Sequence, residues 1–179
     1  MDWNIVVTVR AGPQHERDAL SALARFGRFR PTHFRDVCLG QVRDTAAFLE
    51  ALRTALEEQP RWADCIARVI PAEQTLSFTP ETLLEALKQA MAPLVTRISK
   101  GSFCIRLERR GLAGKVRTRE IEAALGDHVS ELAAAQGTQL QIDLEDPDFV
   151  IAAEIVGQEC GVSLLPRAMR ERYAFVQTR

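Results

Sequence analysis

Residues 100–126, KGSFCIRLERRGLAGKVRTREIEAALG, decide the fold. From Phe103 to Leu107, apolar residues alternate with others, which is the period of a half-buried β-strand. The basic segment 109–115 is interrupted by glycines, a pattern typical of a loop. Thr118 then precedes apolar residues at helical spacing, which predicts an N-cap and a helix that stops near Gly137. The stretch predicts strand, loop and helix in succession.

The segments around this stretch continue an α/β pattern. Thr79-Pro80-Glu81 combines a capping oxygen, a proline and an acid, which predicts a helix start. Pro93 predicts a kink in this helix or its end near Ala92. Residues 72–79 are expected to be a connection. Further strands are predicted over 140–144, 149–156 and 162–165, with a turn over 157–159.

The first 71 residues also alternate strand and helix patterns. Alternating apolar residues predict strands over 3–10, 34–42 and 65–70, with a short strand over 28–30. Helical spacing predicts helices over 14–25 and, after an N-cap at Asp44, through the apolar residues of 48–56. This order fits a ferredoxin-like α/β sandwich. We therefore predict an α+β protein with an N-terminal ferredoxin-like domain, 1–79, and a second α/β domain, 80–179.

Composition sets limits on function. The chain has 179 residues, of which 46% are apolar, so it can bury a core. Lys plus Arg number 23 against 24 Asp plus Glu, which excludes a globally basic nucleic-acid-binding domain but not a basic face. No apolar run approaches the roughly 20 residues that cross a bilayer, and no secretory signal is visible. We predict a cytoplasmic protein with no membrane partner, whose four cysteines are reduced core thiols.

The motifs of common enzymes are missing. The sequence has no GxGxxG after a strand, no GxxxxGK[ST], no GxSxG and no HExxH. The three histidines lie apart from one another and from any cysteine at metal-ligand spacing. The acidic run 143–148 contains Asp146-Pro147 and is predicted to be a charged turn between strands. We therefore predict no catalytic residue, no metal and no cofactor.

Charge is unevenly distributed along the chain. Residues 106–120 contain six cations and two acids. They leave a strand, cross a glycine loop and enter a helix, whose unpaired N–H groups and dipole favour an anion. Arginine adds a planar fork that matches two phosphate oxygens. A second basic segment, the C-terminal tail, contains Arg167, Arg170, Arg172 and Arg179. Charge alone is equally typical of an ordinary solvated face, so both interpretations stay open.

Several of these segments resemble THUMP domains. In the first half of the domain, the resembling residues are KGSFCIR at 100–106, RRG at 109–111, REIE at 119–122 and LG at 125–126. In the second half, they are IDL at 142–144, DPD at 146–148 and the strand that ends at 154–155. Residues 68–75 and 78–79 resemble the connector between a small ferredoxin-like domain and THUMP. Together these segments cover nearly the whole chain.

The resemblance implies a function. THUMP domains are RNA-binding modules of tRNA-modifying enzymes and their adaptors, and this chain is most similar to stand-alone adaptors of a tRNA cytidine N4-acetyltransferase. Both domains are then expected to grip the acceptor stem and 3′ end of tRNA through shape, phosphates and 2′-hydroxyls. The chain is expected to be a non-catalytic adaptor that presents tRNA to a separate modifying enzyme. The expected RNA contacts are Lys100, Arg106, Arg109, Arg110, Lys115, Arg117 and Arg119.

Two alternatives stay open at this point. An interaction module or dimer without RNA would use the apolar stripe from Leu84 to Ile98. An enzyme of unrecognised chemistry would use the carboxylates near Asp146. The sequence leaves the oligomeric state and the identity of the bound tRNAs undetermined.

Overall fold

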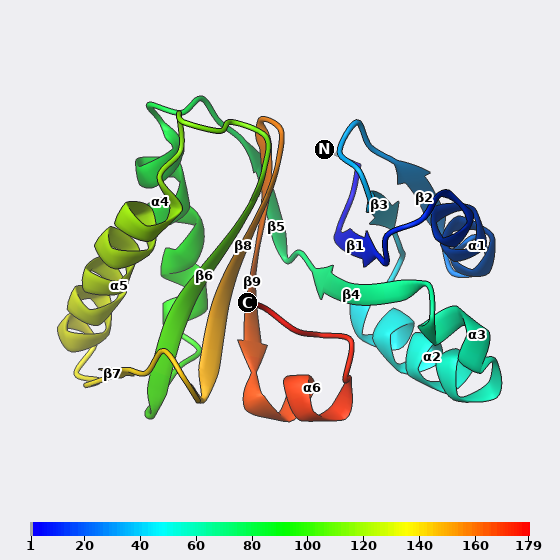
Figure 1. Ribbon diagram of the computed structural model, residues 1–179. Coiled ribbons are helices and arrows are strands. Elements are labelled where there is room, and N and C mark those ends of the chain that lie inside the picture. The colour runs from blue at the N-terminus through cyan, green and yellow to red at the C-terminus, as the bar shows by residue number, and fades with distance from the viewer. Residues whose placement is uncertain (1) are drawn as a thin grey trace. The chain divides into compact units, whose positions relative to one another are not determined.

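The computed structural model describes residues 2–179, which form two compact units (Figure 1). Unit 1 comprises the residues through Ala72 together with Arg170–Gln177. Unit 2 comprises Glu73–Met169 together with Thr178–Arg179. The sequence-based division at 79/80 differs from this one, because the backbone contacts assign residues 73–79 to unit 2 and most of the tail to unit 1.

Unit 1 has the β-α-β-β-α-β order of a ferredoxin-like sandwich. Its elements are β1 (Ile5–Val9), α1 (Pro13–Leu23), β2 (Arg28–Pro31), β3 (Val37–Gln41), α2 (Thr45–Glu58), α3 (Pro60–Ala63) and β4 (Ile66–Pro71). The sheet order is β2-β3-β1-β4, and each pair of neighbours is antiparallel. The predicted α+β class and the predicted order of elements are confirmed.

Local chemistry explains where these elements begin and pack. The Asp44 side chain accepts a hydrogen bond from the Ala47 N–H (3.0 Å), so it caps α2 as predicted. On the edge strand β2, the Phe29 ring lies against Gly40, where an added Cβ would meet the ring at 2.2 Å. The same ring packs 5.7 Å from the ring of Phe48 on α2. Gly40 is therefore required by the close approach of Phe29.

Unit 2 is a five-stranded sheet with two long helices. Its elements are β5 (Gln74–Ser77), α4 (Leu83–Val95), β6 (Ser102–Arg110), α5 (Thr118–Ala135), β7 (Gln141–Ile142), β8 (Phe149–Val156), β9 (Glu159–Pro166) and the start of α6 (Arg167–Arg172). The second division between the units falls inside α6, after Met169. The sheet order is β5-β9-β8-β6-β7, with β6 parallel to both β8 and β7. Helices α4 and α5 cover one face of this sheet (Figure 1).

The core of unit 2 lies between that face and the two helices. Phe103 on β6, Met91 on α4 and Leu125 on α5 are fully buried in one apolar cluster with Ile151 of β8. Removing apolar surface from water stabilises a fold by about 25 cal/mol per Å², so this cluster is the main source of the stability of unit 2. The apolar stripe from Leu84 to Ile98 belongs largely to it, so most of the stripe is not free to dock a partner, which counts against the alternative of an interaction module.

The ends of several elements differ from the prediction. Helix α4 begins at Leu83, not at Pro80, because the Thr79 N–H donates to Thr82 Oγ1 (2.9 Å) in a turn that precedes the helix. The helix also continues past Pro93 to Val95, so the expected end near Ala92 is not observed. Thr118 is the first residue of α5 and makes no capping bond; the N-cap is Arg117.

The structure also differs from the predictions for residues 72–79, for residues 140–144 and after β9. The expected connection 72–79 contains the edge strand β5, which pairs with β9. The expected strand 140–144 is reduced to β7, and the chain turns away after Ile142. The helix α6 that follows β9 is not predicted by the sequence patterns.

Two composition-based expectations concern the whole described chain. All four cysteines are buried and none forms a disulfide, as predicted for core thiols. Among residues 2–179, no helix combines the length and apolar character that a bilayer crossing requires.

The C-terminal tail is hydrogen-bonded to α2 of unit 1 through one carboxylate. Glu50 on α2 accepts hydrogen bonds from Arg172 (2.7 and 2.8 Å), from Arg53 (2.9 Å) and from the Tyr173 hydroxyl (2.9 Å). The Arg172 guanidinium is the largest cause that lowers the pKa of Glu50 from 4.5 to about 2. The Val69 N–H of β4 also donates to the carbonyl of Phe175 (2.9 Å), so the tail is bonded to both the helices and the sheet.

Because the folded pKa of Glu50 lies below its unfolded value, its contribution is present above pH 4.5 and is lost as the pH falls toward about 2. We expect the urea midpoint of unit 1 to fall over this window. Both tryptophans, Trp3 and Trp62, lie in unit 1, so tryptophan fluorescence measures its unfolding.

Glu50→Gln should lower the urea midpoint at pH 7 and flatten the pH dependence below 4.5. Glu57→Gln is the matched control, because Glu57 makes only an exposed pair with Arg53 (3.0 Å). An unchanged acid slope in Glu50→Gln would contradict the role given to Glu50.

Candidate nucleic-acid interface

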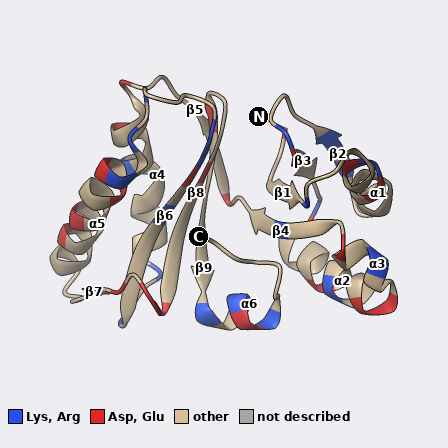
Figure 2. Cartoon of the chain, viewed as in Figure 1, with Lys and Arg blue, Asp and Glu red and all other residues tan. Residues whose placement is uncertain are grey.

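The carboxyl-terminal end of β6 and the first turn of α5 lie at the same end of unit 2. Figure 2 shows basic segments at this end of β6, in the loop that follows and at the start of α5. The first turn of α5 also carries an acid, Glu120, and further acidic segments follow along the helix (Figure 2). Four cations of this region form what we call the cationic rim: Arg109, Lys115, Arg117 and Arg119.

The loop that carries Lys115 has a defined conformation. Gly111 (φ 90°) and Leu112 (φ 56°) both adopt the left-handed region, which is uncommon for a leucine. The Leu112 carbonyl accepts hydrogen bonds from the N–H groups of Lys115 (3.0 Å) and Val116 (3.1 Å). Leu112 packs against the core and Val116 is buried, so the loop is anchored on both sides of its tip. Lys115 is exposed at that tip.

The start of α5 supplies backbone donors beside these cations. No side chain caps the helix, and the first backbone hydrogen bond runs from the Ile121 N–H to the Arg117 carbonyl. The N–H groups of the preceding helical residues and the positive end of the helix dipole favour an anion. Glu122 holds α5 against the sheet, because its carboxylate accepts the Leu107 N–H of β6 (2.7 Å).

The rim cations differ in their partners. Arg117 pairs with Glu120 (3.1 Å), but both side chains are more than two-thirds exposed, so the pair is weak. Arg109 donates to the Gly111 carbonyl, which holds the guanidinium at the strand exit. Among the described residues, Lys115 and Arg119 have no ion pair. The rim is therefore available to an external anion.

Arg110, expected to contact RNA, is instead tied to a buried acid. Its guanidinium forms an ion pair with Glu154 of β8, and the two side chains are only 10% and 5% exposed. A buried charge needs such a partner, because leaving it unpaired costs several kcal/mol. We therefore correct the expectation for Arg110 and exclude it from the rim.

Lys100 and Arg106 lie away from the rim. Lys100 precedes β6, and nine strand residues at about 3.3 Å each separate it from the other end by about 30 Å. Arg106 is at mid-strand and donates to the Leu144 carbonyl. With Arg119 it lines a groove of about 450 Å³ whose apolar wall includes the exposed Ile142 and Leu144. Arg106 thus shares a surface with one rim cation, whereas Lys100 does not join the rim.

The tail arginines are largely neutralised. Arg167 pairs with Asp146 and with Asp148 (3.4 Å), and Arg172 pairs with Glu50 (2.7 Å). Arg179 pairs with Glu108 (2.6 Å). These contacts favour the ordinary solvated face, one of the two interpretations that the charge of the tail left open.

The acidic run 143–148 is a turn, as predicted. One Asp143 oxygen accepts the N–H groups of Glu145 (2.9 Å) and Asp146 (3.0 Å), bonds that lower the pKa of Asp143. The Asp148 carboxylate accepts the Ser102 N–H (2.9 Å), which lowers the pKa of Asp148 and fixes the start of β6. These carboxylates have structural partners, which counts against the enzyme that would use them.

A basic segment of unit 1 escaped the sequence analysis. Residues 25–35 read RFGRFRPTHFR, in which arginines alternate with aromatic side chains. Arg28 and Arg30 are exposed on the edge strand β2, and Arg35 is exposed in the following turn. Unit 1 contains arginines but no lysine. This interleaving of arginine and phenylalanine was the signal that could have identified the segment.

Comparison with known proteins adds a family and a fold. Residues 79–165 match the family model of the THUMP domain. A search of curated protein sequences finds no match. The chain resembles the crystal structure of TrmN from Thermus thermophilus, with 19% identity and a TM-score of 0.61 over 90% of this chain and 44% of that one. It also resembles a 4-thiouridine synthetase solved as an RNA complex with bound ATP, with 13% identity and a TM-score of 0.62 over 91% and 41% of the chains.

A third similar structure is PH1313 from Pyrococcus horikoshii Ot3, with 14% identity and a TM-score of 0.58 over 90% of this chain and 54% of that one. At these identities the likeness establishes a shared fold. The chain spans between 41% and 54% of the length of these solved chains.

The Arg110–Glu154 pair gives a test of the corrected assignment. Glu154→Ala leaves the buried guanidinium without its carboxylate and should lower the free energy of unfolding by about 3–5 kcal/mol. Urea denaturation followed by far-ultraviolet circular dichroism measures the change. Glu131→Ala, at an exposed position of α5, is the control and should change stability by less than about 0.5 kcal/mol. Equal effects of the two substitutions would overturn the assignment.

Proposed function

From the THUMP domain that residues 79–165 form, we propose that this chain binds tRNA and presents its acceptor stem and 3′ end to a separate tRNA-modifying enzyme. The observation that carries the proposal is the cationic rim, where Lys115 and Arg119 stand beside the uncapped start of α5. A chain with a net charge of −1 must attract a polyanion through such a local surface.

The chemistry of the rim favours recognition of the RNA backbone. Lysine and arginine pair with phosphate oxygens, and the backbone N–H groups of a helix start do the same. The groove beside Arg106 and Arg119 adds an apolar wall at Ile142 and Leu144, where an unpaired base of the 3′ end would pack. Contacts of these kinds read shape, phosphates and unpaired bases more than duplex sequence.

The role of adaptor follows from the resemblance of the chain to stand-alone THUMP proteins. The catalyst is then a second polypeptide, and the resemblance names a tRNA cytidine N4-acetyltransferase as the first candidate. One structurally similar protein is a 4-thiouridine synthetase solved with RNA, which supports RNA as the ligand of this fold.

Salt dependence tests the phosphate contacts. If the four rim cations each neutralise one phosphate, the tRNA affinity should fall about 50- to 150-fold between roughly 50 and 200 mM salt. Lys115→Gln and Arg119→Gln should each weaken binding of different tRNAs alike and reduce the magnitude of the salt slope by about 1. Fluorescence anisotropy with labelled tRNA measures both quantities.

Lys88→Gln is the matched control, because Lys88 lies on α4 in a surface pair with Glu85 (3.1 Å). It should leave the affinity and the slope unchanged. An affinity that is flat between these salt concentrations, or a slope that only Lys88→Gln reduces, would refute the rim as the binding surface.

Capture of the tagged chain from native lysate tests the adaptor role. We expect tRNA to co-purify with a modifying enzyme, and ribonuclease treatment or Lys115→Gln/Arg119→Gln to remove the tRNA. Sequencing of the RNA and mass spectrometry of the protein identify both partners. If the wild-type chain recovers tRNA but no modifying enzyme, the adaptor role is refuted, whereas the proposal that the chain binds tRNA stands.

A further inference from the structure

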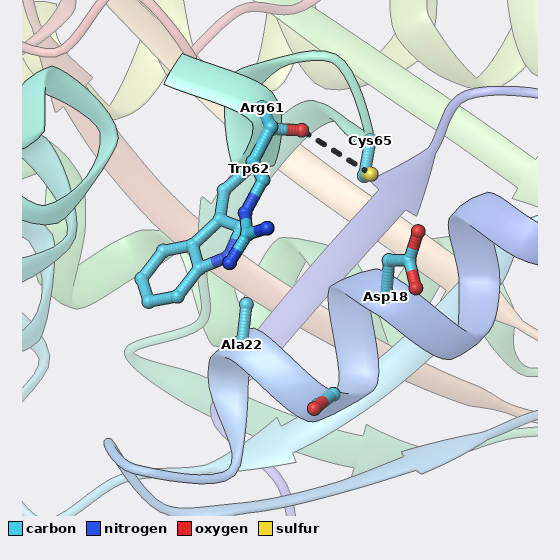
Figure 3. Close-up of a pocket in the computed structure, with 6 residues that line it drawn as sticks. Asp18, Ala22, Arg61, Trp62 and Cys65 are labelled. Carbon is cyan, nitrogen blue, oxygen red and sulfur yellow. Dashed lines mark hydrogen bonds between the residues drawn. The ribbon is translucent and has the colours of Figure 1, made fainter. Parts of the chain in front are cut away.

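A pocket of about 310 Å³ lies between α1 and α3 of unit 1 (Figure 3). Its floor is formed by the buried residues Ala22 and Cys65. Arg61 and Trp62 of α3 form one wall, and Asp18 of α1 lies on the opposite side (Figure 3). Ser21 of α1 completes the lining. The pocket therefore joins an aromatic surface to charged groups of both signs.

The polar groups of this pocket are mostly without partners in the described chain. One Asp18 oxygen accepts a hydrogen bond from Gln14 Nε2 (2.8 Å), which leaves the other oxygen to a ligand. The Arg61 guanidinium, the Ser21 hydroxyl and the Trp62 indole N–H have no hydrogen-bond partner among residues 2–179. Donors and an acceptor thus face the same space without satisfying one another.

The thiol on the floor has a structural role. Cys65 Sγ donates to the Arg61 carbonyl (3.5 Å), which ties α3 to the start of β4. Burial is the largest cause that raises the pKa of Cys65, so the thiol stays protonated at neutral pH. The sulfur is therefore not expected to act as a nucleophile in this pocket.

One arginine outside the lining contacts the aromatic wall. The Arg25 guanidinium lies 5.5 Å from the ring centre of Trp62 and 5.5 Å from that of Phe26. Cation–π contacts of this kind fix the indole and place a positive charge at the edge of the pocket. Arg25 also begins the segment 25–35, in which exposed arginines continue along β2.

We propose that the α1–α3 pocket of unit 1 holds one unpaired nucleobase of a bound RNA. A planar heteroaromatic ring can stack on Trp62 while its edge pairs with Asp18 and Arg61, and the arginines outside attract the adjoining phosphate. A purely anionic ligand would leave the Asp18 carboxylate repelled, and a purely apolar one would leave the donors unpaired. The inference rests on the proposed tRNA binding and adds a contact in the other unit.

The test uses the full chain and the indole N–H signals of its two tryptophans in ¹⁵N-resolved NMR. Titration with adenosine or guanosine 5′-monophosphate should shift the Trp62 signal in a saturable way. Trp3, only 2% exposed in the same unit, is the internal control and should not shift. Ribose 5-phosphate, which lacks the base, should leave both signals in place.

Variants that keep the reporter identify the partners. Arg61→Gln and Asp18→Asn should each weaken nucleotide binding by about tenfold, because each replaces a charged hydrogen-bonding group with a neutral one. Arg43→Gln, an exposed arginine outside both the pocket and the segment 25–35, is the matched control and should bind like the wild type. The thermal transition of every variant confirms that unit 1 is folded.

Labelled tRNA is titrated against the same variants, so the two proposals can fail separately. Normal tRNA binding with an unshifted Trp62 signal would overturn the nucleobase pocket and leave the proposed function standing. A Trp62 shift with ribose 5-phosphate equal to that with the nucleotides would show a simple anion site and would also overturn it. Nucleotide binding at Trp62 without any tRNA binding would refute the proposed function while the pocket stands.

Discussion

The parallel pairing of β6 with β8 is the constraint on which unit 2 depends. The register joins Phe103 to Phe149 at one end and Arg110 to Val156 at the other. Parallel neighbours require a crossover connection, and here α5 supplies it. The chain must therefore leave β6 through the loop at 111–117 and start a helix there. Loop, strand end and uncapped helix start consequently meet at one edge, and cations at those sequence positions become spatial neighbours.

The same pairing explains why adjacent arginines have different roles. Arg109 and Arg110 occupy successive strand positions, whose side chains point to opposite faces of the sheet. One face lets Arg109 bond the Gly111 carbonyl at the strand exit, whereas the other brings Arg110 to Glu154 of β8. A count of charges along the sequence treats the two residues as equal. Strand geometry separates an accessible cation from a structural one.

Patterns that repeat locally were predictable from the sequence, and contacts between distant residues were not. The alternation in β6, the cap at Asp44 and the two-sided apolar strand β8 all depend on neighbouring residues, and their predictions are confirmed. β5 was missed because an edge strand needs few apolar residues; its partner β9 lies far along the chain. The neutralising partners of the arginines were equally hidden, since Arg110 and Glu154 lie 44 positions apart. The RNA contacts expected at the rim remain predictions, while Arg110 and the tail arginines show how partners alter a charge-based inference.

The bond between Glu50 and Arg172, 122 positions apart, also bears on the order of events during translation. A ribosome releases the strands of unit 1 first, yet the residues that complete its hydrogen bonds emerge only after the sequence of unit 2 has been made. Unit 1 is thus begun before unit 2 and finished after most of it. Until then, the nascent sandwich exposes the site on α2 and β4 that the tail will cover.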